Sequence, residues 1–458
     1  MVKKINKSKK KKKQQIKVYL FLKIIIFLAV VICLVIVVKP FLFRDSSQSK
    51  IAVGEENFGK DVYAKFLLEV YDKIQANYWE KITDEQLSLL YKAGLEKLIG
   101  DSYILPSSDK KGAEEIFNKA TEKMEAEQKK ELTANLAQIV LANLQPFGRS
   151  GLYTTKDEKA LRDNVANIDA SIDLYKELAV EKDSSQEEIE KAYQEKNNEL
   201  EKIINDEIQP EEVRQASQKK KAQIDRAHET LADEDKRENY NEAGVESTVS
   251  YKLIGPDIFY IHLKKMSPTT FDEFQAATQA VDEGEALNTL IFDLRGNVGG
   301  AIDLMQWFLG PFIGPDQYAY EFYHRGDKEP FKTKIGWMPS LVRYKKVIIL
   351  IDEQTQSSAE IMAATLKKYN VGVVVGAPTK GWGTVENVFP LDTQLSESEK
   401  YSVFLVHSVT LRDDGQPIEG RGVDPLININ DENWQDQLYD YFNSDKLVKA
   451  VEEALDLD

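Results

Sequence analysis

The sequence contains one cysteine and four histidines in 458 residues. The single cysteine, Cys33, lies in a long apolar run near the N-terminus, so the rest of the chain can form neither a disulfide nor a metal–thiolate site. The histidines show no spacing typical of metal ligands, and core or surface positions are expected for all four: His228, His262, His324 and His407. We therefore expect no metal site and no cofactor.

Acidic residues are missing from the first part of the chain and abundant in the rest. Residues 1–43 hold eleven lysines and no aspartate or glutamate, although the whole chain has a net charge of −16. The remainder is therefore strongly acidic. Because nucleic acid and anionic lipid both attract clustered positive charge, neither is expected as a partner of this acidic part.

A lysine-rich tail, residues 1–17, precedes the apolar run "VYLFLKIIIFLAVVICLVIVVKPFLF" at 18–43. The run is long enough to cross a bilayer core of about 30 Å as a helix, and Lys23 and Lys39 can reach the two membrane faces. It lacks the short apolar core and the cleavage site of a signal peptide. By the positive-inside rule, the sequence predicts a single-pass protein of the cell membrane with a cytoplasmic N-terminus and an extracytoplasmic body.

Four regions follow the predicted anchor. Residues 44–56 are polar and predict a linker. Apolar residues recur every three to four positions in 57–171, which predicts amphipathic helices, whereas 172–244 is dense in charge and predicts a small helical module with a thin core. In 245–458, short β-rich runs alternate with helical patterns, which predicts an α/β domain with a largely parallel sheet.

Two polar turns follow strand-like runs in the α/β region. "RGNVGG" follows "TLIFDL", and "DEQTQSSAE" follows "KKVIILI", so both turns should lie at the same edge of a parallel sheet. Ser357 stands where a strand turns into a helix, a place suited to a nucleophile, although a serine there can also serve only as a helix cap. The backbone N–H groups of Gly299, Gly300 and Ser358 are candidates for holding an oxyanion.

The stretches "LIFDLRGNVGGAIDL", "IDEQTQSSAEIMAATLKKYNVGVVVGAPTKGWGTVE" and "VTLRDDGQPIEGRGVDPLI" together resemble the catalytic domain of the C-terminal processing (tail-specific) serine peptidases. The order and spacing match across about 250–430, and the helical region 57–171 is similar to the family's N-terminal segment. The resemblance implies a ClpP/crotonase-like sheet with helices and unstructured C-terminal tails of exported proteins as substrates. It also implies pairing of two copies through the N-terminal helices.

In this family a serine attacks the scissile carbonyl, a buried neutral lysine takes its proton, and a glutamine positions the lysine. Matched by motif, the serine is Ser357, the lysine position is occupied by Trp382, and the glutamine position is occupied by Glu386. An indole can donate a hydrogen bond but cannot accept a proton. The resemblance therefore implies a peptidase body whose usual base is missing.

Three other side chains are candidates for the missing base. Lys380 precedes Trp382 by two positions, and in an extended strand the two would share a face about 7 Å apart. Glu386 could then hold the ammonium, which would raise the lysine pKa and weaken it as a base. His407 is the second candidate. Glu360 is the third, although it also completes a capping-box pattern with the serine three positions before it.

The charged module at 172–244 resembles a J domain. It lacks the His-Pro-Asp turn of that family and stands where the peptidases carry a PDZ domain. The matching positions are Tyr175, Leu178, Ser185, Glu188, Ala227, Leu231, Asp233, Arg237, Tyr240 and Gly244. We expect a helical spacer or docking module.

Three classes of function fit these observations. The protein is a membrane-anchored serine endopeptidase that cleaves exposed tails with another base, a pseudopeptidase that binds extended chains, or an anchored scaffold. Binding of an extended chain as an added strand beside the peptidase-like sheet would support the second class. The missing lysine makes catalytic activity the open question.

Overall fold

The computed structural model of the protein describes most residues after position 60: 61–206, 208–281, 287–412 and 414–456. The predicted tail, anchor and linker at 1–56 therefore lie outside the described residues. Within the described ranges, no helix has the length and apolar character needed to cross a membrane.

A six-stranded sheet forms the centre of the C-terminal region, in the order β11-β8-β7-β4-β3-β2. All neighbouring strands run parallel except β2, which is antiparallel to β3. The strands are β2 (Val249–Ile254), β3 (Ile258–Leu263), β4 (Thr289–Asp293), β7 (Lys346–Ile351), β8 (Val373–Gly376) and β11 (Ile427–Asn428). The prediction of a largely parallel sheet is confirmed.

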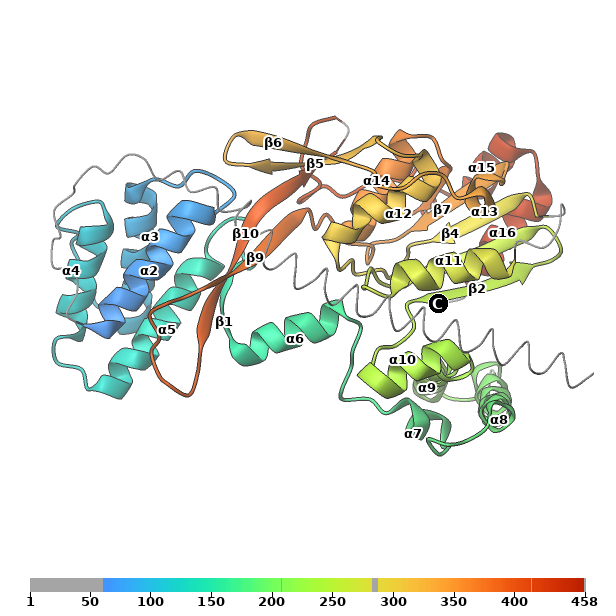
Figure 1. Ribbon diagram of the computed structural model, residues 1–458, viewed down its shortest axis with the longest axis horizontal. Coiled ribbons are helices and arrows are strands. Elements are labelled where there is room, and N and C mark those ends of the chain that lie inside the picture. The colour runs from blue at the N-terminus through green and yellow to red at the C-terminus, as the bar shows by residue number, and fades with distance from the viewer. Residues whose placement is uncertain (1–60, 207, 282–286, 413, 457–458) are drawn as a thin grey trace, which may run out of the picture. The chain divides into compact units, whose positions relative to one another are not determined.

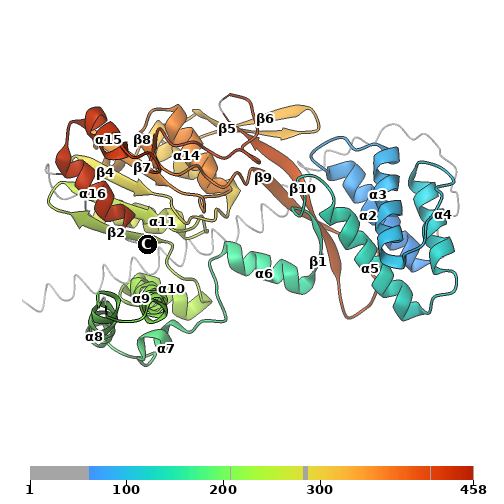
Figure 2. The same ribbon diagram turned by 180° about the vertical axis from the view of Figure 1, so that it is seen from behind.

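Helices cover both faces of this sheet (Figures 1 and 2). Phe259 and Ile261 of β3 pack into one core, while Ile258 and Tyr260 of the same strand pack into the other. The first face carries α11 (Thr270–Ala280), α12 (Met305–Ile313), α13 (Pro339–Val342) and α14 (Ser358–Lys368); the second carries α15 (Trp434–Phe442) and α16 (Asp445–Leu455). Burial on both faces explains why these strands are continuous apolar runs.

A second, antiparallel sheet is built around the long strand β10. β1 and β5 pair along one side of β10 and β9 along the other, while β6 pairs with β5. The strands are β1 (Gly151–Thr154), β5 (Tyr318–His324), β6 (Asp327–Lys332), β9 (Thr384–Pro390) and β10 (Tyr401–Leu411). Strand β1 falls within the region predicted to be helical, because its four residues gain their partners from 401–404, far along the chain.

The N-terminal helices pack against this second sheet. Leu391, Leu395, Val403 and Leu405 share a core with them. These helices are α2 (Val62–Asn77), α3 (Asp84–Ile99), α4 (Lys110–Thr121) and α5 (Ala126–Ala142), while α6 (Thr155–Val165) follows β1 and contributes no residue to this core. Gly100 ends α3 with a φ of 87°, a left-handed conformation that glycine adopts readily at the end of a helix.

Four helices form the module predicted at 172–244. They are α7 (Leu174–Leu178), α8 (Gln186–Ile204), α9 (Glu211–Leu231) and α10 (Glu234–Ala243). The capping box of Ser185 and Glu188 is present at the start of α8. Tyr175, Leu178 and Leu231 lie in the core of the module, as the pattern indicated. Its relationship to J domains stays a prediction.

Candidate active site

The two polar turns at the carboxyl ends of β4 and β7 meet, as the sequence predicted. The N–H of Gln356 donates to the carbonyl of Asn297 at 2.9 Å. A Cβ atom on Gly299 would lie only 2.7 Å from the Cβ of Ser357. Glycine is therefore required where the two turns touch, and the contact places the candidate nucleophile beside the candidate oxyanion loop.

Ser357 has a strained backbone. Its φ is 58° and its ψ is −127°, in a region that residues with a side chain rarely adopt and that costs about 1–3 kcal/mol. The carboxylate of Glu360 accepts a hydrogen bond from the Ser357 N–H at 2.9 Å and helps to hold this conformation. A strained turn that presents a serine between a strand and a helix is the geometry of a nucleophile elbow.

One of the three predicted oxyanion donors is already in use. The N–H of Gly299 donates to the side-chain oxygen of Asn297 at 2.8 Å, which corrects its predicted role. For the N–H groups of Gly300 and Ser358, the described part of the chain offers no hydrogen-bond partner. Gly300 has a φ of 141°, and a Cβ there would lie 2.2 Å from the carbonyl oxygen of Met266, so its backbone packs tightly. Gly300 and Ser358 are thus the available donors.

Glu360 is a buried anchor for the loop before β9. Its carboxylate accepts hydrogen bonds from Thr379 Oγ1 at 2.5 Å, from the Gly381 N–H at 2.8 Å and from the Trp382 N–H at 2.7 Å, besides that from Ser357. Burial raises the pKa of Glu360, and these four bonds act against the rise. Since both oxygens are engaged, the geometry favours the capping role over that of a free base.

The match of Trp382 to the family's lysine position stays a prediction from the sequence motif. The indole N–H of Trp382 points to Glu386 Oε1 at 3.4 Å, and the guanidinium carbon of Arg149 lies 3.3 Å from the centroid of the tryptophan ring. Arg149 also pairs with Glu419 at 3.2 Å, and Glu419 accepts a hydrogen bond from the Gly383 N–H at 2.8 Å. The Trp382 ring is thus held between a cation and a carboxyl group.

Glu386 lies beside this ring on β9. It accepts a hydrogen bond from Thr384 Oγ1 at 2.5 Å. Burial raises the pKa of Glu386, while its two hydrogen bonds and the positive charge of Arg149 lower it. A carboxyl group here is paired to Trp382 and Thr384 and has no lysine to position.

Lys380 does not lie where the sequence placed it. Strand β9 begins at Thr384, and Gly381 has a φ of 77°, so the chain from 380 to 382 is not extended and the same-face relationship to Trp382 does not hold. The Lys380 side chain is exposed, and its only hydrogen bond among the described residues is from its backbone N–H to the carbonyl of Thr355. The structure does not bring its amine to Ser357.

His407 is also turned away from the serine. It lies on β10 with its ring stacked on His324 at 4.2 Å between centroids, and its Nδ1 is 2.8 Å from Ser408 Oγ. Burial and the neighbouring His324 lower the pKa of His407 to about 4, so the ring is neutral near pH 7. Neither His324 nor Ser408 is part of the Ser357 turn.

Arg149 and Glu419 were missed at the level of sequence. Arg149 follows α5 and Glu419 follows β10, so both are distant in sequence from the residue they surround. Nothing local marks either as part of a site. Only the arginine within "FGRSGLY", a segment similar to the peptidases, could have drawn attention.

Comparisons with known proteins relate this region of the chain to a family of peptidases. The sequence model of peptidase family S41 matches residues 257–429. A carboxy-terminal-processing protease from Bartonella bacilliformis is 27% identical over 188 residues, which are 40% of each chain. The carboxy-terminal processing protease CtpB from Bacillus subtilis is 28% identical over 211 residues, which are 45% of this chain and 39% of CtpB.

These matches span about two fifths of the relatives' own length. Among solved structures, a lipoprotein from Streptococcus agalactiae covers 85% of this chain and 99% of its own, with a TM-score of 0.43 and 12% identity, a likeness too distant to support a statement about function. Residues 257–429 thus match peptidase family S41, and over this region the chain is similar to carboxy-terminal processing proteases.

Proposed function

We propose that this protein binds extended, unstructured tails of exported proteins at its peptidase-like site without hydrolysing them, and that residues 18–43 anchor it in the cell membrane with its body outside the cytoplasm. The observation that carries the proposal is the surroundings of Trp382, whose ring packs under Arg149 where a lysine base would stand. General-base help contributes about 10²- to 10⁴-fold to such reactions. Without it, the Ser357 hydroxyl keeps its proton and attacks a peptide bond poorly.

Strand β9 supports binding of an extended chain. It starts two positions after Trp382, and among the described strands it pairs with β10 alone. The backbone groups on its other edge can therefore hydrogen-bond to an added strand. Recognition through the backbone tolerates many side chains, which suits unstructured tails of varied sequence.

A second function, slow hydrolysis, is favoured by one observation. Ser357 keeps a strained φ of 58° although a glycine would adopt it without cost, and strain of this kind is typical of functional turns. The curated relatives are named as proteases. Hydrolysis by this chain would need a proton acceptor other than Lys380, because that side chain is exposed.

The test compares binding and cleavage of one polypeptide. The full-length protein in detergent micelles is mixed with a fluorescent unstructured peptide that has an apolar C-terminus, and anisotropy and electrophoresis are followed. We expect equal binding by wild type and Ser357→Ala, no cleavage by either, and lost binding of a peptide with N-methylated backbone. Cleavage by wild type that Ser357→Ala abolishes would establish hydrolysis instead, and absence of binding would refute the proposal.

A further inference from the structure

The helical module α7–α10 is joined to the peptidase-like domain by polar contacts. Its apolar cluster is separate from the other three clusters of the described residues. The cluster consists of Leu174, Tyr175, Leu178, Ile189, Ile224, Ala227 and Leu231. An interface with no shared apolar core depends on hydrogen bonds and charges. The position of the module is therefore set by a few side chains, most of them on α9.

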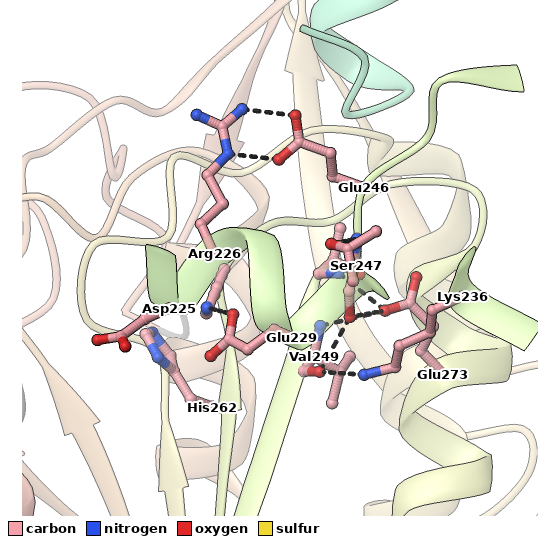
Figure 3. A network of polar contacts seen from close by, with 12 residues as sticks. Asp225, Arg226, Glu229, Lys236, Glu246, Ser247, Val249, His262 and Glu273 are labelled. Atoms are coloured by element: carbon pink, nitrogen blue, oxygen red, sulfur yellow. Dashed lines mark hydrogen bonds and ion pairs between the residues drawn. The ribbon is translucent and has the colours of Figure 1, made fainter. Parts of the chain in front are cut away.

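The first contact joins Arg226 of α9 to Glu246, just before β2 (Figure 3). The guanidinium pairs with both carboxylate oxygens, with a distance of 2.6 Å from Nη2 to Oε1, and the Glu246 side chain is only 4% exposed. Lys236 of α10 donates to the carbonyl of Val249 at 3.0 Å, and Glu273 of α11 accepts hydrogen bonds from the N–H groups at 248 and 249. The start of β2 is thus held from both sides.

The second contact joins Glu229 of α9 to Lys264, one residue beyond β3. The backbone N–H of Lys264 also donates to the carbonyl of Thr248 at 2.9 Å. The same helix therefore holds both β2 and the end of β3, by Arg226 at one point and by Glu229 at the other.

Residues 263–266 contact the candidate oxyanion loop through hydrogen bonds. The carbonyl of Leu263 accepts a hydrogen bond from Asn297 Nδ2 at 2.8 Å. Met266 donates to the carbonyl of Gly299 at 3.0 Å and accepts from the N–H of Ala301 at 2.7 Å. Residues 263–266 thus contact the module on one side and the loop beside Ser357 on the other.

We infer that Glu229 and Lys264 are positioning residues through which the docked module holds residues 263–266, and with them the loop at 297–301, in place beside Ser357. Release of the module loosens the loop and moves the N–H of Gly300 out of line with that of Ser358. The inference concerns the geometry of the site and does not depend on whether the site binds or cleaves.

The expected effect is modest because the ion pair is partly open to solvent. The Lys264 and Glu229 side chains are 34% and 27% exposed. Ion pairs at such sites change an equilibrium by up to about fivefold and weaken with salt. We therefore expect Glu229→Lys to increase local opening of the loop about two- to fivefold.

The experiment measures amide hydrogen exchange in the full-length protein, on peptides that cover 264–267 and 297–302. We expect faster exchange in Glu229→Lys and in Lys264→Glu, wild-type rates in the doubly swapped variant, and faster exchange of the wild type at high salt. Lys252→Glu is the matched control, because it breaks an ion pair of 3.1 Å with Glu453 on α16. It should leave both peptides unchanged.

Amide exchange within α8 and α9 reports whether the module stays folded. If exchange in those helices increases, Glu229→Gln, which keeps the side-chain size, replaces Glu229→Lys. Unchanged exchange at 264–267 and 297–302 with a folded module would overturn the inference. So would a change that the double swap does not reverse, since this shows that the two charges do not act through each other.

Discussion

The guanidinium carbon of Arg149 lies 3.3 Å from the centroid of the Trp382 ring. Arg149 comes from the segment after α5, and Trp382 precedes β9 in the peptidase-like domain. A cation over an aromatic face stabilises a fold by about 0.5–2 kcal/mol. This contact ties the segment after α5 to Trp382, the residue that the sequence motif matches to the family's lysine.

Arg149→Ala should lower the free energy of unfolding by about 1–2 kcal/mol, because it removes the contact with Trp382 and the pair with Glu419. Arg149→Lys keeps the charge but loses the planar group, so we expect a smaller loss. Denaturant unfolding measures both. In a Trp382→Ala background the cost of Arg149→Ala should shrink, and an undiminished cost would show that the ring contributes nothing.

Restoring the family's polar pair should restore chemistry. The double variant Trp382→Lys/Glu386→Gln places a lysine within the surroundings of Arg149, where burial and a nearby cation lower its pKa and leave more of the neutral base. We expect hydrolysis of an unstructured polypeptide about 100-fold or more above the wild type.

Two matched variants control this experiment. Trp382→Leu/Glu386→Gln removes the same ring without adding an amine and should stay inactive. Adding Ser357→Ala to the lysine variant should abolish the gain. A folded lysine variant that hydrolyses nothing would show that the site lost more than its base.

Ser357→Gly should be more stable than Ser357→Ala by about 1 kcal/mol. Glycine adopts a φ of 58° without steric cost, whereas alanine keeps the strain, and the larger conformational entropy of glycine in the unfolded chain offsets part of the gain. Thermal unfolding of the two variants measures the difference. Equal melting temperatures would mean that the turn relaxes once the hydroxyl is removed.

His407 should make the protein less stable at low pH. Burial and the stacked His324 lower the pKa of His407 from 6.5 to about 4, so between these values the unfolded chain binds a proton that the folded chain does not. Stability should therefore fall as the pH drops from about 6.5 to about 4, by about 1–2 kcal/mol once screening of this partly exposed ring is allowed for.

His407→Gln should flatten that part of the stability curve. Because carboxyl groups also titrate in this range, the quantity to measure is the difference between wild type and variant at each pH. His324 faces the same ring and stays in both proteins. An identical slope in the two proteins would contradict the assignment.

The sequence alone determined the sheet and the edge where the site lies. "KKVIILI" and "TLIFDL" are continuous apolar runs because strands buried on both faces need them, and the polar turns after them must meet when the strands are parallel. The sequence alone therefore predicts that Ser357 and Gly299 lie close together. Local signals such as the capping box at Ser185 were equally sufficient, because both partners lie within one helical turn.

Only the tertiary structure decided which side chains surround Trp382. Lys380 is exposed, and the next residue, Gly381, has a positive φ and packs against the backbone at 420–422. Arg149 on Trp382, Glu229 on Lys264 and the pairing of β1 with β10 all join residues far apart in sequence. Such contacts depend on how the helices and strands pack together. A local sequence pattern cannot predict them, because one of the two partners lies in a distant part of the chain.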